Sequence, residues 1–223
     1  MIEVIATTVE DAIEIEAGGA NRIELISMFS EGGLTPSYKM MSDVIKAVKI
    51  PVNIMIRPHS HSFVYTDTEI NLMKKDIETA RMLGANGIVF GVLTEDNIVD
   101  TNKLENLLSV CSNLEVTFHR AIDETNVLSS VKKLAVYKEI TNILTSGGLK
   151  APLHENTNII SNMMTSASQI NILVGGGLTM DNIIAVATKT KAANFHFGST
   201  VQTNGNVVRE KVELLMRKMK DLG

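Results

Sequence analysis

Charged and hydrogen-bonding side chains recur along this sequence just inside or just after short apolar segments. They are Glu24, Arg57, His119 with Arg120, Thr145 with Ser146, and His196 with Ser199. A charged side chain within a short apolar segment is costly to bury unless it is paired or faces a wet cleft. One such residue is compatible with an ordinary buried polar group. Several segments that each supply one indicate a shared polar cleft.

His119 is the best-placed titrating group for acid–base chemistry. Asp123 follows four residues later, and His196 comes from a later segment. A histidine oriented by a carboxylate can transfer protons near neutral pH. Glu24 and Arg57 either pair with each other or bind opposite ends of a substrate, and the alternative for His119 is a core histidine bonded to a neighbouring strand. The candidate catalytic residues are Glu24, Arg57, His119, Arg120, Asp123 and His196.

Glycine-rich turns follow the later apolar segments at 147–148, 175–177 and 198. Glycine allows the backbone to approach an anion closely, and free N–H groups then bind it. The alternative is that each run simply makes a tight turn into the next helix. The candidate anion-binding residues are Ser146, Gly147, Gly175, Gly176, Gly177 and Ser199.

His59 and His61 are candidate metal ligands, because alternate residues of an extended chain point the same way. Two imidazoles are half of a usual transition-metal set, and the alternative is a solvated loop. The chain has 12 methionines, whose thioethers suit Cu(I), but most lie in helical segments and are predicted to fill the core. The single cysteine, Cys111, shares a helix face with leucines and is predicted to be a buried, inert thiol.

Eight short apolar segments alternate with amphipathic helical segments and would position these residues. Such an alternation predicts parallel βαβ units, and eight in 223 residues predict a single-domain, TIM-barrel-like (β/α)8 fold spanning 1–223. A barrel of this kind carries its site at the C-terminal ends of its strands, with phosphate often bound after strands seven and eight. The predicted strands are Ile2–Ala6, Arg22–Leu25, Val52–Ile56, Gly87–Phe90, Val116–Phe118, Asn142–Thr145, Asn171–Val174 and Asn194–Phe197.

Two of the connections after predicted strands are longer than barrel topology needs. They are Ile26–Pro36 and Arg57–Tyr65, whereas typical strand-to-helix loops have 2–6 residues. Long loops on this face are where a barrel builds its site. Predicted helices include Val9–Ala17, Thr101–Cys111 and Val207–Leu222.

Composition and charge bear on the partners of the chain. The formal net charge is −4, aromatic residues are 4% and tryptophan is absent, so we expect no nucleic-acid partner. No apolar run reaches the roughly 18 residues of a membrane span. One cysteine cannot form an internal disulfide, which fits a reducing cytoplasm. A homo-oligomer is compatible with the outer helices of a barrel.

Several blocks of sequence together resemble the CutC family of copper homeostasis proteins, from the first predicted strand to His196. The resemblance implies a TIM-barrel-like cytoplasmic protein linked to copper, and no particular reaction. Family members often carry cysteines, the proposed Cu(I) ligands, where this chain has Ile5 and Ile26. The matching blocks are residues 19–25 (GANRIEL), 30–37 (SEGGLTPS), 55–58 (MIRP), 89–94 (VFGVLT), 116–121 (VTFHRA), 144–148 (LTSGG) and 175–177 (GGG).

The sequence therefore leaves more than one function open. The resemblance implies copper homeostasis, with copper as ligand or cofactor. The polar residues at the strand ends instead favour an enzyme or binding protein for a small anionic or phosphorylated metabolite at the C-terminal rim. A regulatory barrel that acts through partners is a third alternative. Copper chemistry does not explain why Glu24, Arg57, His119, Arg120 and Asp123 match the family while the cysteines do not.

Overall fold

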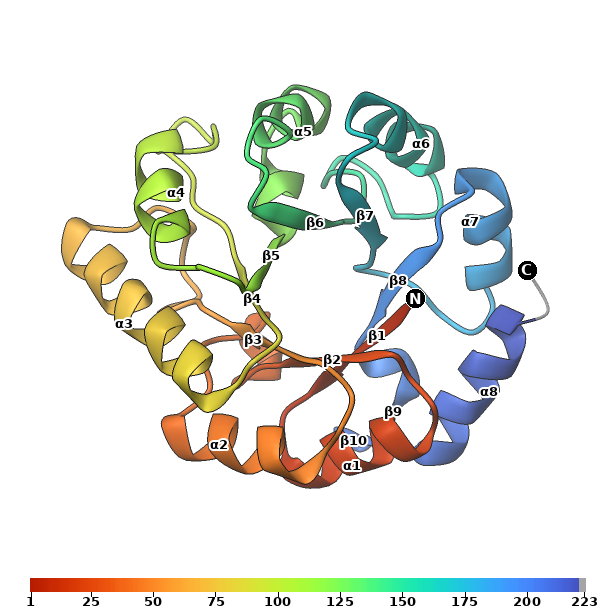
Figure 1. Ribbon diagram of the computed structural model, residues 1–223. Helices are drawn as coiled ribbons and strands as arrows, with labels where there is room; N and C mark the ends of the chain where they lie inside the picture. Colours follow the sequence, from red (N-terminus) through yellow and green to blue (C-terminus); the bar gives the residue numbers. More distant parts are fainter. Residues whose placement is uncertain (221–223) are drawn as a thin grey trace.

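The computed structural model describes residues 1–220, and its eight parallel strands close into a barrel (Figure 1). The strands pair in sequence order, and β8 completes the ring by pairing with β1. The predicted (β/α)8 fold is confirmed. The strands are β1 (Ile2–Ala6), β2 (Arg22–Leu25), β3 (Val52–Met55), β4 (Gly87–Phe90), β5 (Glu115–Phe118), β6 (Ile140–Thr145), β7 (Asn171–Val174) and β8 (Asn194–Phe197).

Helices surround the strands as an outer ring, each one following the strand of the same number (Figure 1). Local sequence fixes their ends. For example, Thr66 and Glu69 form a capping box at the start of α3, and Gly84 ends that helix with φ 90°. The helices are α1 (Val9–Ala17), α2 (Tyr38–Ala47), α3 (Asp67–Leu83), α4 (Thr101–Leu108), α5 (Val127–Leu134), α6 (Thr157–Ser166), α7 (Ile183–Thr190) and α8 (Arg209–Lys220), with 3-10 turns η1 (Phe29–Glu31), η2 (Arg120–Glu124) and η3 (Ser199–Val201).

Most predicted element ends agree with the structure to within two residues, but two predicted helices are shorter. The helix predicted to reach Cys111 ends at Leu108 and continues as turns. The last helix begins at Arg209, because residues 202–207 form a small hairpin of β9 (Gln202–Thr203) and β10 (Asn206–Val207). Asn204 and Gly205 both have positive φ, as a two-residue hairpin turn requires. The predicted end of that helix, Leu222, lies outside the described residues.

The interior of this barrel is unusually polar. Strand residues that face the helices, such as Val4, Ile23 and Phe118, are apolar and fully buried. The residues between them face the barrel axis, where most TIM barrels carry branched apolar side chains. Here Arg22 spans the axis, pairing with Glu3 of β1 at 2.5 Å and with Glu115 of β5 at 2.9 Å. These ion pairs therefore connect the strands at the N-terminal end of the barrel interior, which we call the barrel floor.

Towards the C-terminal ends of the strands, the interior of the barrel also contains an apolar layer. Ile26, Met55 and Val89 form a small buried apolar cluster, with Ile5 packed against it. This layer lies beside the polar residues that the sequence places at the strand ends. Within residues 1–220, no helix is both long and apolar enough to cross a bilayer.

Candidate functional site

A cavity of about 570 Å³ lies at the C-terminal ends of the strands. It is lined by Glu24 of β2, Arg57 after β3, His119 after β5 and His196 of β8. The structure thus brings together five of the six candidate catalytic residues around one cavity, since Arg120 also lines it, and only Asp123 does not. This volume suits a small metabolite. Its walls are partly apolar and include Ile5, Ile26, Met55, Phe63 and Leu144.

Glu24 belongs to a buried chain of three titratable groups. His196 lies between two carboxylates, with Nδ1 2.7 Å from Glu3 Oε1 and Nε2 3.6 Å from Glu24 Oε2. The register of β1 with β8 places Glu3 directly opposite His196. Arg22 holds the second oxygen of Glu3. The result is a continuous line of polar contacts from the barrel floor to the carboxyl group that lines the cavity.

The two carboxyl groups of this chain differ in proton affinity. Burial raises the pKa of Glu24 to about 7, and the negative charge of Glu3 adds to the rise, although the nearby His196 opposes it. Burial pushes the pKa of Glu3 upward too, but the hydrogen bond from His196 and the charge of Arg22 together bring that pKa below its usual value. Glu3 is therefore the permanent anion, and Glu24 is able to gain or lose a proton near neutral pH.

The pKa of His196 is also changed by its surroundings. Burial alone would lower the pKa, but the charge of Glu24 and the hydrogen bond and charge of Glu3 raise it above the ordinary value. The three ligand-type atoms of Glu3, Glu24 and His196 lie within 4.8 Å of one another, close enough to hold a cation. However, the charge of Arg22 and a proton on His196 already compensate these carboxylates, and we interpret the group as a proton-sharing chain.

His119 is held as a neutral ring. Its Nδ1 accepts a hydrogen bond from the amide of Ala121 at 3.2 Å, so the proton of the neutral imidazole is on Nε2. Burial lowers the pKa of His119 to about 3, and the positive charge of Arg57 adds to that shift. The ring packs against Phe63, with centroids 4.9 Å apart. Gly91 makes room for it, because a Cβ there would lie 2.5 Å from Nδ1.

Arg57 supplies a positive charge without a carboxylate partner among residues 1–220. Its guanidinium donates to the carbonyl oxygens of Glu31 at 3.2 Å, Gly33 at 3.3 Å and Ser60 at 3.0 Å. It also lies over the Phe63 ring, 4.7 Å from the centroid. The two long loops predicted from sequence are thus tied together by Arg57. Glu24 and Arg57 do not pair, because the ionic partner of Glu24 is His196.

Three buried atoms of cavity-lining side chains lack a hydrogen-bond partner in the described chain. They are Glu24 Oε1, His119 Nε2 and Arg57 Nε. Leaving a buried polar atom unsatisfied costs about 1–3 kcal/mol, and more when the group is charged. Three of the nine such atoms in the described chain thus lie around this cavity, where a ligand or ordered water has room to complete their bonding.

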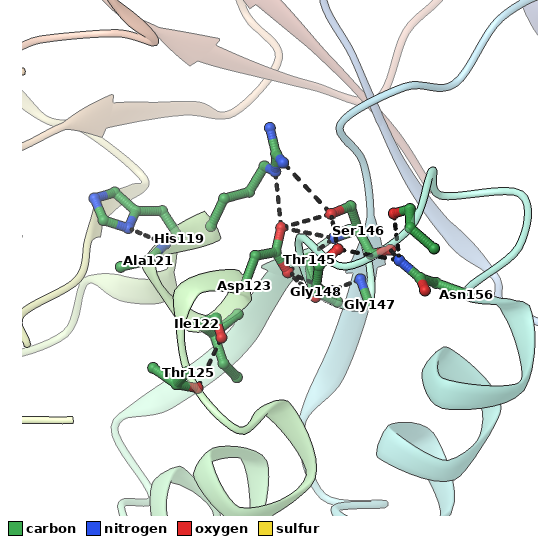
Figure 2. Close-up of polar contacts among 12 residues, drawn as sticks. His119, Ala121, Ile122, Asp123, Thr125, Thr145, Ser146, Gly147, Gly148 and Asn156 are labelled. Carbon is green, nitrogen blue, oxygen red and sulfur yellow. Dashed lines mark hydrogen bonds and ion pairs between the residues drawn. The ribbon is translucent and has the colours of Figure 1, made fainter. Parts of the chain in front are cut away.

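Asp123 has a different role from the one predicted. Its carboxylate accepts hydrogen bonds from Thr145 Oγ1 at 2.5 Å, Ser146 Oγ at 2.7 Å and the amides of Ser146 and Gly148, and it pairs with Arg120 at 2.9 Å. Figure 2 shows these contacts converging on Asp123, with no contact to the His119 ring. Asp123 therefore does not orient His119; the amide of Ala121 does so.

The same network explains part of the predicted anion site. In the turn after β6, the amides of Ser146 and Gly148 already bind Asp123, and the Gly147 amide donates to Thr145 Oγ1 at 2.9 Å (Figure 2). Sequence reasoning expected an anion at this glycine turn. The anion found there is a side chain of the protein itself, so Ser146 and Gly147 are not available to a ligand.

Other predicted anion-binding residues do face the cavity. Gly176, Gly177 and Ser199 line it, whereas the Gly175 amide is used by the Thr145 carbonyl at 2.9 Å. Within residues 1–220 the amides of Gly176 and Gly177 donate to no other group. A Cβ on Gly176 would lie 2.6 Å from the guanidinium carbon of Arg120, so glycine is required for that arginine to lie over the turn.

His59 and His61 lie apart from the cavity lining. Their rings stack, with centroids 3.6 Å apart, and His59 Nε2 is 3.2 Å from Glu69. Burial and the neighbouring His61 lower the pKa of His59. In the described part of the chain, the ligand atoms of His59, His61 and Glu69 do not all lie close enough together to hold one metal ion. The loop histidines thus form a stacked pair beside α3.

Sequence reasoning missed the residues that support the cavity from below. Glu3 and Arg22 each stand two positions before a residue that lines the cavity, Ile5 and Glu24, and so share the same face of their strands. The signal in the sequence was a charged residue at alternate positions of a buried strand, which predicts a side chain inside the barrel. The prediction from strand ends did not include these positions.

Comparison with known proteins identifies the family of this barrel. The CutC family model matches residues 1–201, and the chain belongs to that family. It is 40% identical to the human "Copper homeostasis protein cutC homolog" over 197 residues, which are 88% of this chain and 72% of the human protein. It is 36% identical to a CutC family protein of Xanthomonas axonopodis, over 87% of this chain and 81% of the relative.

Solved structures agree with this assignment. A CutC protein from Streptococcus agalactiae superposes with a TM-score of 0.85 and 31% identity, covering 91% of this chain and 99% of that one. Phosphoribosyl anthranilate isomerase from Thermococcus kodakaraensis gives a TM-score of 0.67 over the whole chain at 16% identity. That second likeness shows a shared fold alone.

Proposed function

We propose that this protein binds a small anionic metabolite, phosphorylated or carboxylated, in the cavity at the C-terminal end of its barrel. Its relatives are named for copper homeostasis, and we propose that this chain serves that role through the metabolite rather than through a resident copper ion. The single cysteine, Cys111, is a buried free thiol, which supports a cytoplasmic location.

The observation that carries the proposal is the set of unsatisfied buried atoms around one cavity. Glu24 Oε1 and His119 Nε2 lack partners, and Arg57 has no carboxylate to neutralise it. An arginine held by carbonyl oxygens keeps its charge at all relevant pH values and suits contact with carboxylate or phosphate. The amides of Gly176 and Gly177, which donate to no other group within residues 1–220, add further donors to the cavity lining.

The donors of the cavity do not fit Cu(I). Cuprous ion prefers thiolate and thioether, and the cavity lining contributes one thioether, Met55, and no thiol. Cys111 belongs to the outer core, where its thiol donates to the Leu107 carbonyl, and burial raises its pKa to about 12. Carboxylates and an imidazole suit harder cations. The donor set of this cavity therefore does not suit a resident cuprous ion.

A thermal-shift titration with inorganic phosphate and with phosphoglycolate tests the proposal. A ligand selective for the folded state at ten times its Kd stabilises by about 1.4 kcal/mol, or roughly 3 °C in Tm for a chain of this size. We expect a saturable shift in the native protein. Arg57→Gln should abolish the shift, because it removes the unpaired charge.

Arg81→Gln is the matched control, since Arg81 is exposed on α3 and away from the cavity. Arg57 also clamps two loops through carbonyl oxygens, so the Tm of Arg57→Gln without ligand is expected to fall. The ligand-induced change in Tm, and not the Tm itself, is therefore the readout. A shift of equal size in Arg57→Gln and native protein contradicts the proposal.

A further inference from the structure

We propose, resting on the anion site above, that the protein catalyses proton transfer at a carbon next to a carbonyl group, with Glu24 as base and His119 as donor to the carbonyl oxygen. Glu24 lies in β2, His119 directly follows β5, and both line the same cavity. Each presents one buried atom without a partner, an acceptor on Glu24 and a donor on His119. Proton abstraction beside a carbonyl needs one of each.

Glu24 is built to exchange a proton. One oxygen has no partner in the protein, and the other faces His196, which is bonded in turn to Glu3. A base is most effective when its pKa is near the working pH, and burial places the pKa of Glu24 at about 7. The charged and titratable groups that act on it are Glu3, Arg22 and His196, from β1, β2 and β8.

His119 is positioned to donate a hydrogen bond from Nε2 while its ring is neutral. Because the Ala121 amide donates to Nδ1, the ring proton is on Nε2, and this N–H has no hydrogen-bond partner in the described chain. A neutral imidazole matches the modest acidity of an enol better than an imidazolium does, so the proton can be shared with the forming oxyanion. The packed ring of Phe63 and the close contact with Gly91 fix its direction.

The reaction balances without an oxidant or reductant. Glu24 takes the proton from the carbon beside the carbonyl, the C–H electron pair forms a C=C bond, and the carbonyl π pair moves to oxygen. His119 Nε2–H stabilises that oxygen. For exchange or epimerisation the proton returns from Glu24 to the same carbon and the oxyanion electron pair re-forms the carbonyl, which regenerates the base. For isomerisation of a 2-hydroxy carbonyl compound, His119 Nε2 gives its proton to the former carbonyl oxygen and takes the proton of the neighbouring hydroxyl, while Glu24 delivers the carbon-bound proton to the former carbonyl carbon. The net result is exchange, epimerisation or isomerisation.

The rest of the cavity defines the substrate class. Arg57 and the amides of Gly176 and Gly177 would hold an anionic group at one end, while Ile5, Ile26 and Met55 exclude water around the reacting carbon. The volume of about 570 Å³ admits a short chain. We therefore assign a short carbonyl compound that carries a phosphate or carboxylate.

Hydrogen–deuterium exchange at carbon tests this chemistry directly. The native protein is incubated in D2O with dihydroxyacetone phosphate, ribulose 5-phosphate or hydroxypyruvate, and loss of the C–H signal is followed by NMR against a protein-free sample. We expect exchange with at least one probe, and the phosphate and carboxylate arms separate the two anion classes. Glu24→Gln and His119→Asn should each slow it by about 100-fold or more, while exposed Glu95→Gln should not.

The pH dependence of exchange and the effect of a chelator test the role of Glu24 as base. The exchange rate should rise with pH through the pKa of Glu24. Glu3 is a positioning residue, so Glu3→Gln should shift the pH profile. A chelator should have no effect, and exchange that a chelator abolishes overturns the assignment of Glu24 as base. Exchange that survives Glu24→Gln, in a variant shown to be folded by circular dichroism, also overturns it.

Failure of this inference and failure of the anion site are distinguishable. A ligand-induced Tm shift that depends on Arg57, without carbon exchange for any of the three probes, overturns proton transfer and leaves the binding site. Absence of both the shift and the exchange overturns both proposals.

Discussion

Two polar clusters at the same end of the barrel differ in how completely they are satisfied. The Asp123 carboxylate is surrounded by donors from Arg120, Thr145, Ser146 and Gly148. The Glu24 carboxylate has one oxygen near His196 and the other without a partner. Both residues are almost fully buried, at 3% and 2% exposure, so burial alone does not separate them.

The number of hydrogen bonds that each carboxylate accepts distinguishes a structural role for Asp123 from a functional role for Glu24. A buried charge with all its hydrogen bonds is a stabilising part of the scaffold, and removing it leaves its donors unsatisfied. A buried carboxylate with an open lone pair carries a cost in the free protein that a ligand can remove. Sites that bind or react often retain such a cost. Asp123 thus builds the rim, and Glu24 serves the cavity.

The largest expected effect is the loss of stability in Asp123→Asn. An amide cannot accept the full set of donors and presents an NH2 group to one of them, so we expect a loss of about 3 kcal/mol. Urea unfolding at neutral pH measures it. Asp181→Asn, on the exposed start of α7, should change stability by less than about 0.5 kcal/mol. A loss below about 1 kcal/mol in Asp123→Asn would show that its network is not structural.

A similarly large effect should appear in the acid dependence of His119→Asn. The pKa of His119 is lowered from 6.5 to about 3, so its contribution to stability is present above pH 6.5 and is lost as pH falls towards 3. Asparagine keeps an acceptor for the Ala121 amide but has no such titration. Relative to the variant, the native protein should therefore lose about 3 kcal/mol between neutral pH and about pH 4.

Urea unfolding at both pH values gives the comparison for His119→Asn, with exposed His154→Asn as control. Parallel acid losses in the native protein and His119→Asn would mean that the ring takes up a proton as readily in the folded state as in the unfolded state. The interpretation of His119 as a ring held neutral by burial would then be wrong.

The smallest effect is expected for Glu24→Gln in the free protein. The pKa of Glu24 is raised to about 7, so the stability it contributes is present below its ordinary pKa of 4.5 and is lost as pH rises through 7. Above neutral pH, Glu24→Gln removes a buried negative charge and loses only the long contact of Glu24 with His196, at 3.6 Å. Unfolding at about pH 8 should give no loss, or a gain of about 1 kcal/mol. A loss equal to that of Asp123→Asn would erase the distinction between the clusters.

Sequence patterns were sufficient to predict the barrel because each strand and helix carries its own local signal. The eight strands follow from apolar segments, and caps such as Thr66 and Gly84 mark helix ends. The position of Glu24, Arg57, His119 and His196 in one cavity follows from barrel topology, since the C-terminal ends of parallel strands converge. That part of the site needs no knowledge of side-chain contacts.

The roles of individual residues could not be predicted in this way, because they depend on which hydrogen-bond partners each side chain has in the folded protein. Asp123 and Glu24 look alike in sequence, yet one turns towards the glycine turn after β6 and the other towards the cavity. The tautomer of His119 is fixed by a backbone amide two residues away. Glu3 joined the site only through the register of β1 with β8. These are pairings across the fold, which a single sequence does not encode locally.

A crystal structure of the protein with phosphoglycolate tests the central claim most directly. The planar carboxylate of this compound resembles an enediolate, and its phosphate supplies the anionic end. We expect the carboxylate to lie within hydrogen-bond distance of Glu24 Oε1 and His119 Nε2, with the phosphate on Arg57 and the amides of Gly176 and Gly177. Phosphoglycolate bound elsewhere, or a cavity in which these atoms bond only to ordered water at saturating ligand, would contradict it.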